Sequence, residues 1–179
     1  MTRFKVRLTI VALAFSISAA AGMAHAATDS QLVADAQRTI ATYQKTDPGL
    51  RSFFERSAGY VVFPSVLKGG IGIGGAHGSG VAFESGRAIG RASLSQVSVG
   101  AQLGGQEYSE VIFFETPQSL ADFKKGQFTF SAQATAVALK SGAAANAKFK
   151  EGVAVFTIAK GGLMFEASLG GQKFKFEPF

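Results

Sequence analysis

The chain has 179 residues, a formal net charge of +6 and no cysteine. This length allows one domain with a sizeable core, which packing alone must stabilise because no disulfide can form. His77 is the only histidine after residue 26. A zinc site, which normally draws on several histidines and cysteines, is therefore excluded, and no metal is expected.

The first 26 residues have the pattern of a cleavable signal peptide. Three basic residues, ending at Arg7, precede an apolar run over 8–21, and Ala24-His25-Ala26 has the small residues that signal peptidase requires. The run is shorter than the about 20 residues of a transmembrane helix, which favours export over the alternative of a retained anchor. Cleavage after Ala26 leaves residues 27–179 as a single domain with a net charge of +3.

Two helices are expected at the start of this domain. Apolar side chains recur at helical spacing from Leu32 to Tyr43, which predicts a helix over 28–45. Asp47-Pro48 is typical of a helix N-terminus, since aspartate caps the helix and proline suits its first turn. It predicts a short second helix with Phe53 on its buried side.

From Ala58 onwards the apolar period becomes that of a strand. Residues 59–63 are predicted to form a strand that Pro64 ends. Over 68–81, every even position from 70 to 80 is glycine or alanine, so one strand, or two that turn near Gly78, would have a face almost without side chains. Such a face usually marks the close approach of another backbone or a ligand, and packing against a neighbouring sheet is the interpretation that we favour.

The sheet is expected to continue over 87–106. Its apolar positions change there from even to odd numbers, which predicts a bulge or turn near Ser95-Gln96. Residues 111–114 form a continuous apolar run, typical of a strand buried on both faces. Thr116-Pro117 then begins a predicted third helix that Gly126 ends.

The last third of the chain is less regular. Residues 128–134 alternate as a strand, and the alanine-rich piece to Ala147 fits a strand, a helix or a loop. Residues 153–158 and 163–176 are predicted to form a final hairpin that turns at Lys160-Gly161-Gly162.

The sequence offers little for catalysis. Residues 70–75 match the G-x-G-x-x-G pattern of dinucleotide sites, but no helix begins there to bind a pyrophosphate, so no cofactor is expected. Ser79 lies two residues from His77 without an orienting carboxylate nearby in sequence. We therefore expect a protein that is not an enzyme, unless a serine and a carboxylate converge on His77 in the folded chain.

Basic residues are scattered through the domain. Nucleic-acid binding would favour a stronger positive balance and interleaved exposed aromatic side chains, so it is not expected. Several basic residues on one face could each contribute about 1 kcal/mol at an anionic lipid surface. The candidates for head-group contact lie on or beside the glycine-rich strands and at the end of the third helix: Lys68, Arg87, Arg91, Lys124 and Lys125.

Several motifs together resemble the SYLF domain family. They are Ala58-Gly59-Tyr60-Val61-Val62-Phe63-Pro64, the glycine-rich run over 68–80, Ser98 to Gln106, 111–114, and the ending over 161–172, which is similar to the exported bacterial branch. The resemblance covers residues 30–176. The glycines that match the family core, which we expect to serve the fold more than ligand contact, are Gly70, Gly72, Gly74, Gly75, Gly78 and Gly80.

The resemblance implies lipid binding, with a preference for phosphoinositides among eukaryotic members and actin binding among fungal ones. An exported chain does not meet cytosolic actin, so only binding of an anionic phospholipid membrane is carried over. The expected fold is α+β: a strongly bent antiparallel, glycine-rich sheet or partly closed barrel with short flanking helices. The expected function is non-enzymatic lipid binding at the bacterial envelope, in the periplasm. The alternative is a structural or protein-interaction module there, with an unknown partner.

Overall fold

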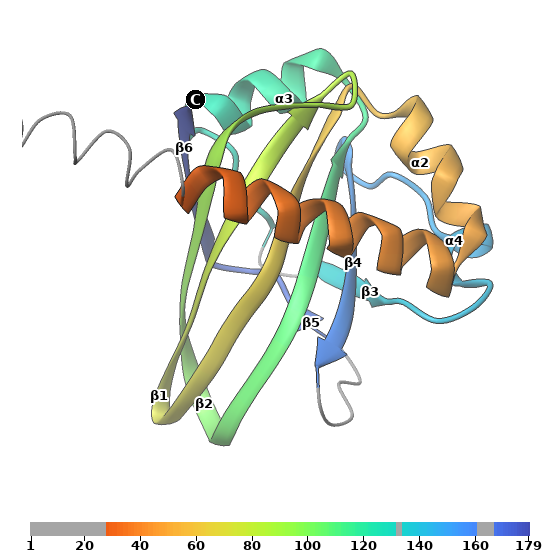
Figure 1. Ribbon diagram of the computed structural model, residues 1–179. Coiled ribbons are helices and arrows are strands. Elements are labelled where there is room, and N and C mark those ends of the chain that lie inside the picture. The colour runs from red at the N-terminus through yellow and green to blue at the C-terminus, as the bar shows by residue number, and fades with distance from the viewer. Residues whose placement is uncertain (1–27, 132–133, 161–166) are drawn as a thin grey trace, which may run out of the picture.

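The computed structural model describes residues 28–131, 134–160 and 167–179 (Figure 1). For 71–73, 98–104 and 167–168 it describes only the backbone. The predicted signal peptide lies outside the described residues.

The helix predicted over 28–45 is confirmed and covers residues 28–46. It lies across one face of the sheet (Figure 1), and its fully buried Ala36 and Tyr43 point into the core. The Tyr43 hydroxyl donates a hydrogen bond of 2.8 Å to the backbone oxygen of Ser109. This bond joins the helix to the middle of the sheet.

The other helices are short. They are η1 (Pro48–Leu50), α2 (Arg51–Arg56), α3 (Pro117–Lys124) and α4 (Ala143–Asn146). The second and third predicted helices are thereby confirmed, with Thr116 as the N-cap of α3 and Gly126 just after its end at a φ of 68°. Among the described helices, none combines the length and the apolar character that crossing a membrane demands.

β1 (Gly59–Glu84) and β2 (Arg87–Phe114) form one long antiparallel hairpin. Contrary to the prediction, Pro64 does not end the first strand. It lies within a shift in the register of the β1–β2 pair, and such a bulge accommodates a residue that has no N–H to donate.

β1 doubles back on itself and β2 follows it, so that each strand runs to one end of the molecule and returns (Figure 1). The two halves of β1 lie against each other. A Cβ added to Gly80 would lie 2.7 Å from the Phe63 ring, and one added to Gly78 would lie 2.9 Å from Val66. The first half of β1 thus makes the close approach that the glycine run predicts. Gly78 lies in the returning half of β1 rather than at a turn.

The irregularity predicted near Ser95-Gln96 lies elsewhere. These two residues pair regularly with His77 and Ala76, and the register shifts instead opposite the segment from Ile71 to Ile73. The extra residues of β2 are taken up where the hairpin doubles back, because the outer strand follows the longer path there.

In the described part of the chain six strands form the sheet, in the order β1-β2-β4-β3-β5, with β6 also paired to β2. The strands after the hairpin are β3 (Thr135–Ala138), β4 (Val153–Lys160), β5 (Ala167–Ser168) and β6 (Gln172–Pro178). All pairings are antiparallel except β3–β4. The α+β class with a mostly antiparallel sheet is confirmed.

The predicted strongly bent sheet or partly closed barrel is wrong, because the sheet as a whole is neither closed nor strongly curled, although the β1–β2 hairpin itself doubles back. A barrel requires the two edges of the sheet to pair. Here β1 and β5 stand at opposite ends of the strand order and do not pair with each other over the described residues. β6 and β4 pair with different halves of β2, so neither closes the sheet.

Over the described residues, the predicted C-terminal hairpin is not formed. β4 pairs with the second half of β2 and with β3, whereas β6 pairs with the first half of β2. Residues 161–166, which carry most of the predicted turn, lie outside the described residues. Alternation therefore correctly indicates that both segments are strands, but it does not show that they pair with each other.

Residues 128–131 form no strand, although they alternate like one. The Phe128 and Phe130 rings lie 5.0 Å apart, and both contact the ring of Phe174 on β6. The alternation reflects packing on the core rather than pairing. Of the ambiguous piece that follows, Thr135–Ala138 is the strand β3 and Ala143–Asn146 is α4.

Candidate functional site

The structure gathers three of the five predicted lipid-contact residues at one end of the molecule. Arg87 pairs across the hairpin with Glu84, whose carboxylate forms an ion pair of 2.7 Å with Lys124. Lys125 is the next residue after Lys124 and is exposed. Since Glu84 neutralises Lys124, the charges left for a ligand at this end are those of Arg87 and Lys125.

The other two predicted residues lie apart from this group. Arg91 forms an ion pair with Asp29 on the N-terminal helix, so its charge supports the fold. Lys68 is nine residues from Gly59, which meets Phe83 at the Arg87 end. At about 3.3 Å per strand residue, this places Lys68 on the order of 30 Å away.

Lys68 lines a hollow of about 430 Å³ near the end where β1 doubles back. Leu67 beside it is 63% exposed. Lys160 also lines the hollow, but it binds Glu107 at 3.0 Å. The Ser65 hydroxyl, and then Lys160, hold the pKa of Glu107 below its usual value. Lys68 therefore remains a single cation beside an exposed leucine.

His77 is exposed on β1, with Ser95 as its pairing partner in β2. Among the described residues, no serine or carboxylate forms a hydrogen bond with its side chain, and no cluster of three potential metal ligands occurs. The arrangement in which His77 would serve as a general base is therefore not formed by the described part of the chain.

Asp47 holds α4 beside η1. Its buried carboxylate accepts the Ala144 N–H at 2.7 Å and the Gly49 N–H at 3.0 Å. The bond from Ala144 is the main cause that lowers the pKa of Asp47. Phe149, just after α4, packs against Phe53 of α2 with ring centroids 5.4 Å apart. These contacts hold η1 and α2 against α4 and Phe149, so that two segments far apart in sequence form one surface.

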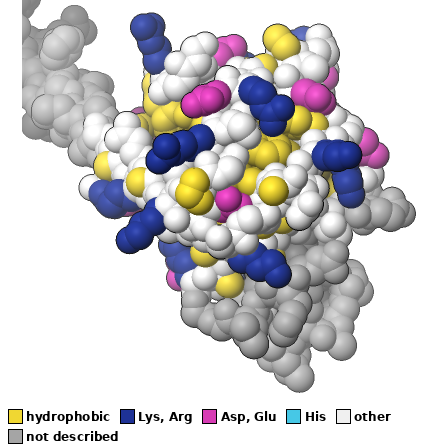
Figure 2. Space-filling model, turned by 90° about the vertical axis from the view of Figure 1, so that its right-hand side faces the viewer, with side chains coloured by type: hydrophobic (Ala, Val, Ile, Leu, Met, Phe, Trp, Pro, Cys, Tyr) yellow, Lys and Arg dark blue, Asp and Glu magenta, His cyan; other side chains and the backbone are white. Residues whose placement is uncertain are grey.

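We call this surface the α4 face and define it as residues 45–56 and 138–151. Its charges are mostly positive: exposed Lys or Arg stands at 45, 51, 56, 140, 148 and 150. Against these it has exposed Glu55 and Glu151 and the buried Asp47. Figure 2, which views the side that carries α2 and α4, shows Lys and Arg side chains distributed around exposed hydrophobic ones.

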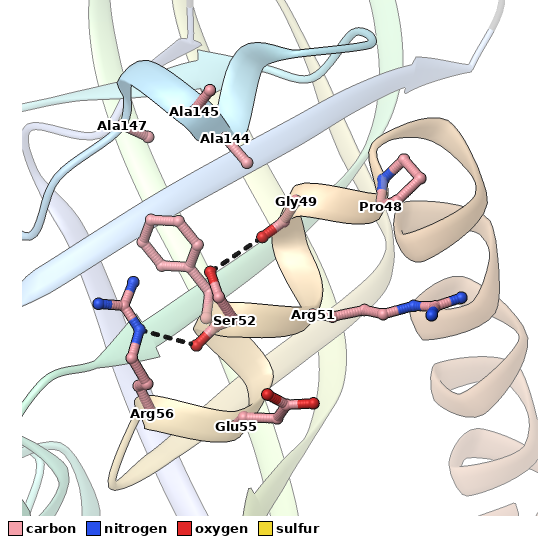
Figure 3. Close-up of a pocket in the computed structure, with 10 residues that line it drawn as sticks. Pro48, Gly49, Arg51, Ser52, Glu55, Arg56, Ala144, Ala145 and Ala147 are labelled. Carbon is pink, nitrogen blue, oxygen red and sulfur yellow. Dashed lines mark hydrogen bonds between the residues drawn. The ribbon is translucent and has the colours of Figure 1, made fainter.

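An α2–α4 hollow of about 560 Å³ lies on one side of α4, lined by Arg51, Arg56 and Ala144 among others (Figure 3). The Arg56 guanidinium lies 5.7 Å from the centroid of the Phe53 ring, and its Nε donates to the Ser52 carbonyl at 3.1 Å. Arg51 and Arg56 point away from each other in Figure 3. The hollow therefore presents separate cations at a surface rather than a clamp on one small anion.

A β3–β4 cavity of about 440 Å³ shares Ala147 with the α2–α4 hollow. Its floor is apolar and includes Phe130, Val155 and Leu169, each of which is at most 9% exposed. Lys148 and Lys150 stand at its rim. Phe149 between them points inward to Phe53, so the alternation of an extended segment directs both lysines outward.

Sequence reasoning missed the α4 face because its basic residues come from two segments that no local pattern connects. One signal was available. The order Lys148-Phe149-Lys150 alternates basic, aromatic and basic residues, which predicts an inward ring between two outward cations.

The fold and surface define a class: an α+β domain built on a doubled-back glycine-rich hairpin, with a basic face over apolar hollows. Residues 95–177 match the family model described as "Ysc84: Las17-binding protein actin regulator". Over these residues the chain is similar to this family, whose characteristic unit is the SYLF domain. SYLF domains are generally non-catalytic binding modules.

The chain is also similar to Beta cell expansion factor A of Aeromonas veronii. The two are 28% identical over 130 residues, which cover 71% of this chain and 49% of that protein. This chain thus spans about half the length of that relative.

Proposed function

We propose that this SYLF domain is a non-enzymatic, peripheral binding module for anionic phospholipid membranes, and that the α4 face makes the contact. The observation that carries the proposal is the charge of this face, which has six exposed basic residues and two exposed acidic ones. The match of residues 95–177 to the family model supports a binding role.

The expected strength follows from the charges. A basic residue near an anionic bilayer contributes about 1 kcal/mol, so Arg51, Arg56, Lys148 and Lys150 would together supply on the order of 4 kcal/mol. Exposed charges are screened over about 10 Å at moderate salt. Binding should therefore be weak and reversible, and it should decrease as the salt concentration rises.

Co-sedimentation with vesicles tests both the function and its location. The vesicles are phosphatidylcholine alone or with phosphatidylglycerol, at low and high salt. One variant replaces Arg51, Arg56, Lys148 and Lys150 with glutamine. Its matched control makes the same change at the residues predicted from sequence: Lys68, Arg87, Lys124 and Lys125.

The α4-face variant should lose most binding to anionic vesicles, and the control should keep most of it. Loss in the control alone would move the contact to the residues predicted from sequence. Equal recovery of the unaltered protein with neutral and anionic vesicles, unchanged by salt, would refute anionic-lipid binding.

A protein-interaction module of the periplasm is the second candidate. Val97 and Leu67 are 75% and 63% exposed near the end where the hairpin doubles back. Exposed apolar side chains of this size suit burial against another chain. A stable oligomer or a specific partner, without any vesicle binding, would favour this function.

Export to the periplasm or envelope is part of the same proposal and rests on the pattern of residues 1–26. N-terminal sequencing of the protein recovered from an envelope fraction tests it. A first residue of Ala27 is expected, and an intact N-terminus in the cytosol would contradict it.

A further inference from the structure

The β3–β4 cavity is enclosed by parts of the fold that meet at one edge of the sheet. β3 pairs with β4 only at Phe156 and Thr157, so it does not cover the first residues of β4. The uncovered Val153 and Val155 form the floor of the cavity. The gap therefore follows from the short pairing between these two strands.

The chemistry of the lining changes from the floor to the rim. Val153, Val155 and Leu169 are 8%, 5% and 1% exposed, whereas the rim residues Lys148 and Lys150 are exposed. A volume of about 440 Å³ falls within the usual range for small-molecule sites, which are mostly apolar with a few placed polar groups.

The charge at the rim favours an anion. Two lysines stand against one carboxylate, that of Glu151. Over the described residues, no carboxylate lies within ion-pair distance of Lys148 or Lys150. Their ammonium groups are therefore available to an anionic group that stands at the mouth.

We infer that the β3–β4 cavity binds one acyl chain of an anionic amphiphile, with the chain on Val153, Val155 and Leu169 and the carboxylate or phosphate head between Lys148 and Lys150. Burial of each CH₂ contributes about 0.8 kcal/mol, so the chain rather than the exposed ion pairs supplies most of the affinity. This inference rests on the proposed function and names its ligand as a single lipid chain rather than a bilayer surface.

Calorimetry on the full domain tests it with laurate, lysophosphatidylglycerol and, as the neutral control of equal chain length, glycerol monolaurate, all as monomers. The cavity variant is Ala134→Phe, which places a ring among the lining residues. Its matched control is Ala145→Phe, which lines the α2–α4 hollow instead. Thermal unfolding checks that both variants fold.

Laurate should bind with one-to-one stoichiometry, and more tightly than glycerol monolaurate. Ala134→Phe should abolish binding and Ala145→Phe should retain it. If Ala134→Phe fails to fold, Lys148→Gln with Lys150→Gln provides the second test. That double variant should weaken laurate binding about three- to tenfold, the range of two exposed ion pairs, and leave glycerol monolaurate unchanged. Relative affinities of laurate and lysophosphatidylglycerol distinguish a carboxylate from a phosphate head.

Absence of laurate and lysophosphatidylglycerol binding, while anionic vesicles still bind, would overturn this inference and leave the proposed function standing. Laurate binding that Ala134→Phe does not reduce would overturn the location. One-to-one binding of laurate without vesicle binding would instead refute the peripheral membrane function and keep the cavity as the site of a free amphiphile.

Discussion

Tyr43 and Glu110 are both fully buried polar residues, but they lie on opposite faces of the sheet and are surrounded differently. The Tyr43 hydroxyl donates to the Ser109 carbonyl at 2.8 Å and also lies 3.2 Å from the Ser109 hydroxyl. Over the described residues, the side chain of Glu110, the next residue along β2, accepts one hydrogen bond, of 3.2 Å, from the Gln172 amide to Oε2.

The difference extends to the neighbours of Glu110. Its Oε1, the Oε1 of Gln172 and the hydroxyl of Thr157 are buried without a hydrogen-bond partner in the described part of the chain. Burial raises the pKa of Glu110 to about 7, against a smaller opposing effect of the Gln172 bond. One face thus holds a satisfied polar contact that joins a helix to the sheet. The other holds an incompletely satisfied acid whose charge state depends on pH.

The largest expected effect is a pH dependence of stability that comes from Glu110. In the unfolded chain this carboxyl ionises near pH 4.5, and in the folded protein near pH 7. Between these values the unfolded chain has lost a proton that the folded one retains, so the free energy of unfolding falls as pH rises and then levels off. The fall should be about 3 kcal/mol, measured by urea unfolding across this range.

Glu110→Gln should remove this slope. Glu107→Gln is the matched control, because Glu107 lies in the same strand but is partly exposed and has a lowered pKa. The control should keep the fall between pH 4.5 and 7. An unaltered slope in Glu110→Gln would show that the carboxyl is ionised inside the fold or reached by water.

Removing the Tyr43 hydroxyl should have the next largest effect. Tyr43→Phe removes the hydroxyl, so the Ser109 carbonyl loses the hydrogen bond that Tyr43 donates to it. We expect a loss of about 1–2 kcal/mol in the free energy of unfolding. Tyr60→Phe, at a position with 8% exposure on the same face, is the control and should cost less. Equal losses would mean that the hydroxyl of Tyr43 contributes nothing specific.

The smallest expected effects come from two substitutions, each of which removes one hydroxyl, on opposite faces of the sheet. Thr157→Val removes a buried hydroxyl that has no partner over the described residues, so it should be neutral or stabilise by up to about 1 kcal/mol. Ser109→Ala removes a hydroxyl that Tyr43 contacts, and it should destabilise by about 1 kcal/mol. Opposite signs in thermal unfolding would support the contrast between the faces, and a loss in both would indicate that Thr157 has a partner in solution.

Local signals in the sequence account for much of the fold. The helix over 28–46 follows from apolar spacing, and Thr116-Pro117 and Asp47-Pro48 mark helix starts that the structure has. The SYLF motifs were also readable, because they are runs of residues in order. Buried Glu110 was not predicted, since it stands beside the apolar run 111–114 and only tertiary packing shows that it is covered.

The sequence by itself determined the helices, the strand-forming segments and the resemblance to the SYLF family, because helical period, capping and motif order act over a few neighbouring residues. Only the tertiary structure decided that β1 doubles back against its own first half and that the sheet stays open. It alone also brought Arg51 and Arg56 to the same surface as Lys148 and Lys150. These outcomes depend on which segments pair and pack across the whole chain, and alternation marks a strand without naming its partner.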